Sequence, residues 1–229
     1  MTQSTVLLTG AGGAALPSMI DSLRTKGYRV VAVDADSNAA GLYLADRGYR
    51  VPLAADPAFP GVLRAICHAE GVAALVPLVD EELLPVARLA AEEDIALIAP
   101  HPAFTALCLD KYALMRRLAD VGLPVPETRL LGEGWDGMPF PLILKPRTGR
   151  GSRGVRVFAT PDELGTYLAT ARPGVDTTLI QRCIEGTEYT VSVVVWRDGI
   201  VRAVVPKEII DKRGITRLAV TRKNDAIDR

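Results

Sequence analysis

The first hundred residues alternate short apolar runs with segments of helical spacing, and this alternation constrains the fold more than any other feature of the sequence. The apolar runs, which are typical of buried strands, cover residues 4–10, 29–36, 71–80 and 95–100. The helical segments cover residues 16–28, Phe59–Glu70 and Glu81–Glu93. Strands that alternate with helices of this length predict a parallel sheet covered on both faces. We therefore expect an α/β fold that opens with a Rossmann-like unit.

A glycine-rich turn follows the first strand. Gly10, Gly12 and Gly13 lie where this strand gives way to a helix, and Asp34 ends the next strand 24 residues after Gly10. Such glycines can hold the pyrophosphate of a nicotinamide dinucleotide at the helix N-terminus, while the acid binds a ribose hydroxyl. Ala15 stands where the third glycine of that motif belongs. Two other interpretations of this turn therefore stay open: a tight turn without a ligand, and an edge that contacts a small ligand or substrate.

An acidic cluster follows the strand at residues 71–80. Glu81 and Glu82 fall in the first turn of the predicted helix, where carboxylates complement the positive end of the helix dipole. Asp80 lies at the carboxyl end of a parallel strand, where ligands gather in folds of this class. We expect a capping role for the two glutamates and keep Asp80 as a candidate ligand contact.

The sequence changes character after residue 100. Prolines at 100 and 102 end the strand pattern, and residues 104–121 have the spacing of one continuous helix. This helix carries Lys111, which the spacing alone would place on a solvated face. We expect a domain boundary here, with one domain over residues 1–102 and a second over residues 103–229.

The stretch LILKPRTGRGSRGVRVF, residues 142–158, predicts a strand, a glycine-rich loop and a second strand. Lys145 ends the first strand, and the loop carries three glycines and three arginines: Gly149, Gly151, Gly154, Arg147, Arg150 and Arg153. Glycines let backbone amides approach phosphate oxygens, and arginines can neutralise the negative charge of the phosphates. The stretch is not a Walker motif, because no Gly-Lys-Ser/Thr follows it. A phosphate-binding loop, a solvated hairpin and a nucleic-acid contact are all open from these residues.

Past this hairpin the sequence predicts a helix capped by Thr160, then a strand, a bend and two long strands that turn at Asp198-Gly199. The bend could give a nucleotide base backbone partners, and Glu188 could hold ribose hydroxyls. The polar or flexible residues of this bend are Gln181, Glu185, Gly186 and Glu188. Farther on, Lys207, Lys212 and Arg213 could face a substrate, although solvated side chains at a strand edge are the simpler interpretation.

Composition narrows the classes of partner that the protein is expected to bind. The chain has 27 basic and 27 acidic residues, so no bulk field favours nucleic acid or an anionic membrane. Cys67, Cys108 and Cys183 are widely spaced in apolar surroundings, which predicts reduced thiols and no metal site. No uncharged apolar window reaches the roughly 18 residues that a spanning helix needs. We expect a cytoplasmic protein without nucleic-acid or membrane partners.

The order of these features resembles the ATP-grasp superfamily, and within it the halves of the carbamoyl phosphate synthetase large subunit. The resemblance rests on LDKYALMRRLADVGLPVPET, LILKPRTGRGSRGV and IQRCIEGTEYTVSVVV, preceded by the Rossmann-like unit. It implies a pre-ATP-grasp domain and then an incomplete α+β ATP-grasp domain with a glycine-loop lid. The lid subdomain would cover about residues 125–186, and the start of a C-terminal subdomain would cover residues 187–229. Proteins of this kind bind ATP and Mg²⁺, activate a small-molecule carboxylate as an acyl phosphate and pass it to an amine or similar nucleophile, and a homodimer is compatible with the resemblance.

The resemblance also implies roles for particular residues. Lys111 and Lys145 match the two basic positions that contact the ATP phosphates. The lid loop corresponds to Gly149, Arg150, Gly151, Ser152 and Gly154. The strip along the adenine corresponds to Gln181, Arg182, Cys183 and Ile184, and Glu188 matches the acid that binds the ribose.

No residue of this chain matches the family's magnesium ligands, which lie in a Glu-x-Asn pattern on late strands, and the catalytic residues stay unassigned. Thr216 stands where the synthetase carries a histidine, while Glu208 matches its acid. We expect those ligands after Arg229, which would make the chain a fragment of a longer ligase. The alternatives are a regulatory nucleotide-binding module without turnover and, from the turn at Gly10, a nicotinamide-dependent oxidoreductase.

Overall fold

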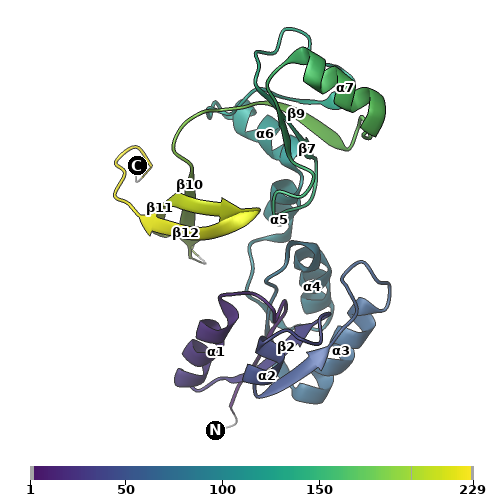
Figure 1. Ribbon diagram of the computed structural model, residues 1–229. Helices are drawn as coiled ribbons and strands as arrows, with labels where there is room; N and C mark the ends of the chain where they lie inside the picture. The colour runs from purple at the N-terminus through teal and green to yellow at the C-terminus, as the bar shows by residue number, and fades with distance from the viewer. Residues whose placement is uncertain (1–2, 197, 228–229) are drawn as a thin grey trace. The chain divides into compact units, whose positions relative to one another are not determined.

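The computed structural model describes residues 3–196 and 198–227, and its contacts divide the chain into two units, Met1–Leu109 and Asp110–Arg229 (Figure 1). Among the described residues, no helix has the length and apolar content that a membrane crossing requires.

The first unit is built on a five-stranded parallel sheet with the order β3-β2-β1-β4-β5. Its strands are β1 (Thr5–Leu8), β2 (Arg29–Asp34), β3 (Arg47–Arg50), β4 (Val72–Val76) and β5 (Ala96–Leu97). The central strands β1 and β2 are apolar and buried, as a sheet covered on both faces requires. The Rossmann-like unit expected from the sequence is therefore confirmed, with β3 as a strand that the apolar pattern did not reveal.

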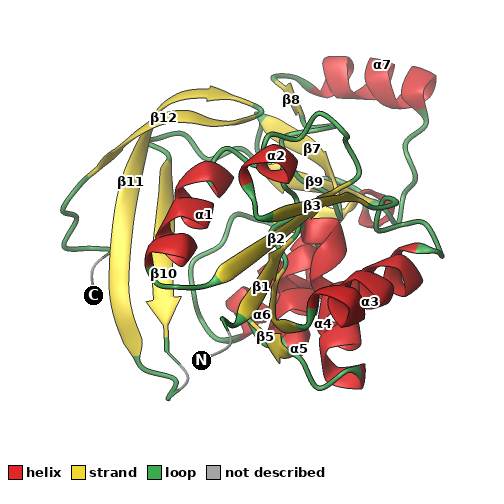
Figure 2. Ribbon diagram, turned by 90° about the horizontal axis from the view of Figure 1, so that it is seen from below, coloured by secondary structure: helices red, strands yellow, loops and turns green. Residues whose placement is uncertain are grey.

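Helices pack against both faces of this sheet (Figure 2). They are α1 (Leu16–Thr25), α2 (Gly41–Leu44), α3 (Phe59–Glu70) and α4 (Asp80–Glu92), while α5 (Pro102–Leu109) packs against α4. Successive strand residues point to opposite faces, so Val6 and Leu8 pack with Leu16 and Ile20 on the face of α1, whereas Leu7 packs on the other face. The face of Leu7 is covered by α3 and α4, through side chains such as Phe59, Leu63 and Val86.

The second unit contains a four-stranded antiparallel sheet with the order β6-β9-β7-β8. Its strands are β6 (Thr128–Leu130), β7 (Leu142–Pro146), β8 (Arg156–Phe158) and β9 (Thr178–Arg182), and a short 3-10 helix, η1 (Leu131–Glu133), follows β6. Helix α7 (Pro161–Ala171) begins at Thr160, whose side chain accepts a hydrogen bond from the Glu163 amide as predicted. Leu164 of α7 packs with Leu142, Leu144 and Ile180 on one face of the sheet. The opposite face is left for other contacts.

A three-stranded antiparallel sheet completes the second unit, with the order β10-β11-β12. Its strands are β10 (Tyr189–Val195), β11 (Val201–Arg213) and β12 (Ile215–Thr221). The sequence predicted two strands after the bend, and the third arises because Gly214, with φ of 74°, turns the chain back at once. The division of this unit into a lid and a second subdomain stays a prediction.

The prediction of one continuous helix over residues 104–121 is wrong. The structure has two helices, α5 and α6 (Lys111–Asp120), with Asp110 in an extended conformation between them. The Asp110 carboxylate accepts hydrogen bonds from the amides of Tyr112 and Ala113, both at 3.1 Å. Asp110 therefore acts as an N-cap, which starts a new helix where the apolar spacing alone continues the old one.

All three cysteines are free, as expected, but their surroundings differ. Cys67 is buried in the core of the first unit, and burial raises the pKa of its thiol to about 11. Cys183 is half-buried. Cys108 is exposed, so the apolar surroundings expected for it are wrong.

The contact of α2 with β3 depends on a glycine. A Cβ atom at Gly48 would lie 2.0 Å from the carbonyl oxygen of Leu42, which is backbone and cannot move aside cheaply. We expect Gly48→Ala to lower the free energy of unfolding by about 2 kcal/mol or more. Gly61→Ala in α3, where nothing lies within 4 Å of the added atom, is the matched control and should cause no loss. Urea unfolding of both variants checks this, and equal midpoints would contradict it.

Candidate functional site

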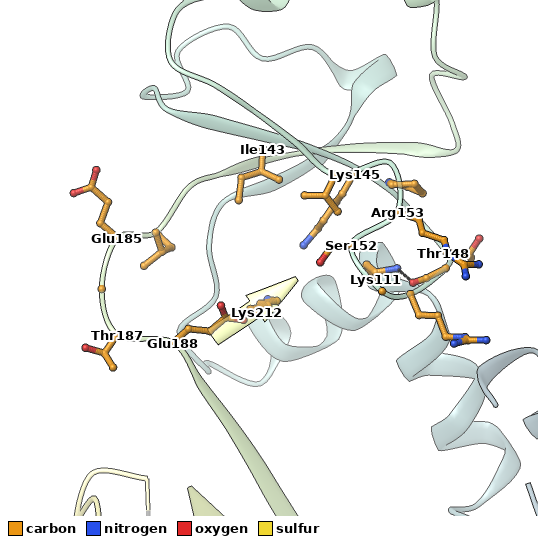
Figure 3. A pocket seen from close by; sticks show the side chains of 17 residues that line it. Lys111, Ile143, Lys145, Thr148, Ser152, Arg153, Glu185, Thr187, Glu188 and Lys212 are labelled. Carbon is orange, nitrogen blue, oxygen red and sulfur yellow. Dashed lines mark hydrogen bonds and ion pairs between the residues drawn. The ribbon is translucent and has the colours of Figure 1, made fainter. Parts of the chain in front are cut away.

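The second unit holds a cavity of about 680 Å³ beneath the glycine-rich loop (Figure 3). Five segments line it: the end of β7, the loop that follows β7, the linker before β10, and α6 and β11, which contribute one lysine each. The lining residues are Lys111, Ile143, Lys145, Pro146, Thr148, Gly149, Arg150, Gly151, Ser152, Arg153, Val155, Ile184, Glu185, Gly186, Thr187, Glu188 and Lys212.

The alternation of β7 directs Lys145 into this cavity. Leu142 and Leu144 point to the face that α7 covers, so Ile143 and Lys145 point to the opposite face and line the cavity. Lys145 is half-buried there, and its ammonium donates a hydrogen bond to Oε1 of Gln181 at 2.7 Å. A rigid strand thus presents a cation at the cavity wall (Figure 3).

An ion pair brings α6 to the same place. The guanidinium of Arg147 binds the Asp110 carboxylate through two nitrogens, with Nε 2.9 Å from Oδ1 and a terminal nitrogen 2.6 Å from Oδ2. The Lys111 amide donates to the Arg147 carbonyl at 3.0 Å, and the Lys111 ammonium donates to the Gly149 carbonyl. Arg147 also lies over the Tyr112 ring, 5.6 Å from its centroid. The start of α6 is therefore fastened to the loop that follows β7.

The Asp110–Arg147 ion pair corrects the expectation that Arg147 would neutralise phosphate charge. Its guanidinium is held by Asp110 and does not line the cavity, whereas Arg150 and Arg153 do. The hydrogen bonds from Arg147 hold the pKa of the Asp110 carboxyl below its usual range. Arg147 instead fastens the start of α6, where Lys111 lies, to the loop after β7.

Lys111 and Lys145 are electrostatically coupled. Burial lowers the pKa of the Lys145 ammonium, and the positive charge of Lys111 lowers it further. The two lysines come from separate segments of the sequence, 34 residues apart, and line one cavity. An anion between them would relieve both effects.

The glycine-rich loop uses backbone conformations that favour glycine. The φ angles are 101° at Gly149, 66° at Gly151 and 72° at Gly154, and Ser152 adopts 56°. The Ser152 hydroxyl donates to the Gly214 carbonyl at 3.0 Å, in the turn between β11 and β12. A Cβ atom at Gly214 would lie 3.0 Å from the Gly151 carbonyl oxygen. This turn therefore holds the loop in place over the cavity.

The facing wall carries an exposed ion pair. The Lys212 ammonium contacts the Glu188 carboxylate, and the Glu188 carbonyl accepts from the Ile209 amide at 2.9 Å. Both side chains are more than a third exposed, so the pair stabilises the fold by only about 0–1 kcal/mol. Glu188 is directed toward Lys212, and Glu185 points away from Lys145 (Figure 3). A ligand could therefore exchange for either partner at small cost.

Eight of the residues predicted from the resemblance line the cavity: Lys111, Lys145, Gly149, Arg150, Gly151, Ser152, Ile184 and Glu188. Four do not: Gly154, Gln181, Arg182 and Cys183. Arg182 pairs in register with Leu142, whose side chain faces the α7 core, so Arg182 lies on the sheet face opposite Ile143 and Lys145. Gln181 shares the face of Ile143 but is buried behind Lys145. Gly154 approaches the ring of Pro146 instead.

Sequence reasoning missed two cavity residues of different kinds. Ile143 could have been found, because it lies two residues before Lys145 on the same strand face. Lys212 was interpreted as a solvated edge side chain, but β11 is the central strand of its sheet and Lys212 lines the cavity. Register shifts near Asp211 determine its direction, and no local sequence signal reveals them.

The charge of the cavity favours a polyanion. Five basic side chains line it against two carboxylates, which leaves an excess of three positive charges. The described residues include no cluster of three or more histidine, cysteine, aspartate or glutamate side chains that could hold a metal ion. They do not by themselves form a magnesium site, because Glu188 is paired with Lys212 and Glu185 points away.

The turn after β1 uses its acid internally. The Asp34 carboxylate accepts hydrogen bonds from the amides of Gly12 and Asp36, each at 2.8 Å, so both of its oxygens are engaged by the loop itself. This geometry favours the tight-turn interpretation over the ribose contact of a nicotinamide dinucleotide. Glu81 and Glu82 lie in the first turn of α4, as expected for acids that complement the helix dipole, and Asp80 lies there with them. The ligand contact kept open for Asp80 stays a prediction.

The sequence matches two family models in succession. Residues 6–98 match the PylC-like N-terminal domain, and residues 108–222, half of the chain, match the ATP-grasp domain. The carbamoyl-phosphate synthase of Methanobrevibacter smithii is 28% identical over 181 residues, which are 75% of this chain and 47% of that protein. The chain thus spans about half the length of this relative.

Solved structures share the fold. An L-amino acid ligase from Bacillus licheniformis aligns with a TM-score of 0.76 and 16% identity over 99% of this chain and 57% of that protein. The N5-carboxyaminoimidazole ribonucleotide synthetase of Thermus thermophilus aligns with a TM-score of 0.71 and 20% identity, over 93% of this chain and 57% of that protein. The fold class expected from the resemblance is confirmed.

The Asp110 cap can be tested apart from any ligand. Asp110→Ala removes both the cap and the partner of Arg147, so we expect a loss of about 2 kcal/mol in unfolding free energy, whereas Asp110→Asn keeps a cap acceptor and should lose about half as much. Because the carboxyl pKa is lowered in the folded state, its contribution is present at neutral pH and lost as the pH falls below about 4. Urea unfolding at pH 7 and pH 3.5 measures both effects.

Asp120→Ala, at the other end of α6, is the control for this experiment. A carboxylate at a helix C-terminus opposes the dipole, so its removal should cost nothing. Equal losses for Asp110→Ala and Asp120→Ala would contradict the role of the cap.

Proposed function

We propose, because the chain belongs to the ATP-grasp family, that the cavity of its second unit binds ATP and that the protein is a ligase which activates a carboxylate. The convergence of Lys111 and Lys145 beneath the glycine-rich loop supports this most directly. Two cations of this kind suit a chain of phosphates, whose negative charge needs to be matched along its length. The excess of three positive charges in the cavity fits a nucleoside triphosphate.

The cavity offers a different surface for each part of the nucleotide. Lys111, Lys145 and the amides of the loop would hold the phosphates, while the apolar side chains of Ile143 and Ile184 would contact the base. Glu188 would bind the ribose after exchanging its weak pair with Lys212. Lys212 would then be released toward the phosphates.

The proposed reaction has two steps. A carboxylate oxygen of the substrate attacks the γ-phosphorus, and the bond from that phosphorus to the β,γ-bridging oxygen breaks. ADP departs, and the substrate becomes an acyl phosphate. An amine then attacks the carbonyl carbon, inorganic phosphate departs, and the amine loses a proton to give an amide. The lysines would stabilise the charge that develops on the bridging oxygen, and the loop would keep water from the acyl phosphate.

Magnesium is bound with ADP in the structure of a related carboxylase domain from Hydrogenobacter thermophilus. The described residues of this chain do not form a metal site alone. A second candidate function is a module that binds a nucleotide without turning it over, for which the phosphate-binding cations of the cavity would be enough.

Nucleotide binding is tested by thermal stabilisation. We expect millimolar ATP to stabilise the protein, by about 2.7 kcal/mol at a hundredfold excess over Kd. Lys145→Met should weaken ATP binding at least about tenfold, because a cation at the phosphates is lost. Lys26→Met, at an exposed site of the first unit, is the control and should bind like the wild type. No stabilisation of the wild type at millimolar ATP would refute the proposed site.

Turnover separates the two candidate functions. If the protein is a ligase, phosphate release from ATP should depend on added carboxylate, and an amine should convert the acid into an amide that mass spectrometry detects. Lys145→Met should abolish both signals. The assay uses the full-length protein, because this chain spans about half the length of its relative. ATP binding by that protein without carboxylate-dependent phosphate release, across a panel of amino acids and small acids, would favour the nucleotide-binding module instead.

A further inference from the structure

Gln181 occupies an unusual position for a residue expected to contact adenine. It is 5% exposed and lies behind the cavity wall, on the sheet face shared by Ile143 and Lys145. Its Oε1 accepts from the Lys145 ammonium at 2.7 Å, and its Nε2 donates to the Thr128 hydroxyl oxygen at 2.6 Å. Thr128 lies directly opposite Gln181 on the neighbouring strand β6. Both ends of the amide are therefore engaged inside the sheet.

The polarity of these hydrogen bonds is fixed at each end. An ammonium group can only donate, so the amide must present its oxygen to Lys145. The Thr128 hydroxyl donates its proton to the Pro126 carbonyl at 2.8 Å, so it must accept from the other side, and the amide presents its NH₂ group there. Glutamine satisfies both partners. A glutamate would have no proton for Thr128, and the hydroxyl would have to abandon Pro126 to reach it.

The amide also leaves the lysine without a counter-charge. Lys145 has no carboxylate partner among residues 3–196 and 198–227, and Gln181 is the group that its ammonium contacts. The charged groups that share the cavity with it are Lys111 from α6, Arg150 and Arg153 from the loop, Glu188 before β10, Glu185 in the linker and Lys212 from β11. Of these, Lys111 is near enough to act on Lys145, and it repels it.

We infer that Gln181 is a positioning residue, whose amide, oriented by Thr128, aims Lys145 at the cavity and leaves its positive charge for an anionic ligand. This inference rests on the proposed function and adds to it, because it assigns Gln181 to the lysine and not to the base. A neutral acceptor holds the ammonium in place by a hydrogen bond, whereas a carboxylate would hold it by neutralising it. The affinity for phosphate would then depend on which of the two stands at position 181.

The first test needs no nucleotide. Carbon-13 NMR of methylated lysines gives the titration of Lys145 in the ligand-free protein, with its signal assigned by Lys145→Arg. Gln181→Glu places a negative charge beside the ammonium, and we expect the pKa of Lys145 to rise by about one unit or more. An unchanged titration would overturn the inference, and this result does not depend on whether the protein binds ATP.

The second test measures coupling in ATP binding. We expect Gln181→Glu to weaken ATP binding about tenfold and to reduce the salt dependence of binding, because the new carboxylate already neutralises the Lys145 ammonium. In a Lys145→Met background the same substitution should have no further effect. An equal loss in both backgrounds would show that Gln181 acts on the fold alone and would overturn the inference. Absence of ATP binding by the wild type would refute the proposed function separately.

Thr128 supplies a second pair of variants, which leaves the Lys145–Gln181 contact itself in place. Thr128→Val removes the hydroxyl that orients the amide and should weaken ATP binding by a smaller factor, about threefold. Thr128→Ser keeps the hydroxyl and should restore the affinity that the valine variant loses. If serine and valine behaved alike, orientation of the amide by Thr128 would be excluded.

Discussion

The bidentate ion pair between Asp110 and Arg147 is the contact on which the rest of the site depends. It joins two segments that lie 37 residues apart, and it uses one carboxylate twice, as the N-cap of α6 and as the partner of a guanidinium. Both side chains are about one third exposed or less, so water weakens the pair only in part. Because Lys111 is the next residue after Asp110, fixing the cap also fixes where that lysine lies.

Around this contact the unit assembles positive charge from three different elements. Lys111 comes from a helix start, Lys145 from the end of a strand and Lys212 from the central strand of another sheet, while the glycine-rich loop brings two arginines. In water such a cluster would repel itself weakly, but partial burial makes the repulsion stronger. Fastening the elements by the Asp110–Arg147 pair and by the Ser152–Gly214 hydrogen bond keeps the cations together without a ligand.

How much of this the sequence predicts depends on how local the cause is. Helix α3 was predicted at its observed bounds, because Phe59-Pro60 at its start and the left-handed Gly71 at its end are local signals. The break before α6 was missed, although aspartate is a strong cap, because the apolar spacing continues across Asp110. The direction of Lys212 and the burial of Gln181 were missed since they depend on strand register, which partners far along the chain determine. Most residues named from the resemblance line the cavity, from α6, β7, the loop and the linker before β10. Gln181 and Arg182 do not, because successive residues of β9 point to opposite faces of the sheet.

The lowered pKa of Lys145 connects stability with binding. Between its lowered folded value and its ordinary value, the unfolded chain binds more protons than the folded one, so this lysine stabilises the fold increasingly as the pH rises through that window. Below the window the folded state has to keep a half-buried cation beside Lys111, at a cost in stability. An anionic ligand between the two lysines removes that cost, because it favours the charged form that burial disfavours. The unliganded site is therefore strained by its own charge, and relief of that strain would supply part of the free energy of binding a polyphosphate.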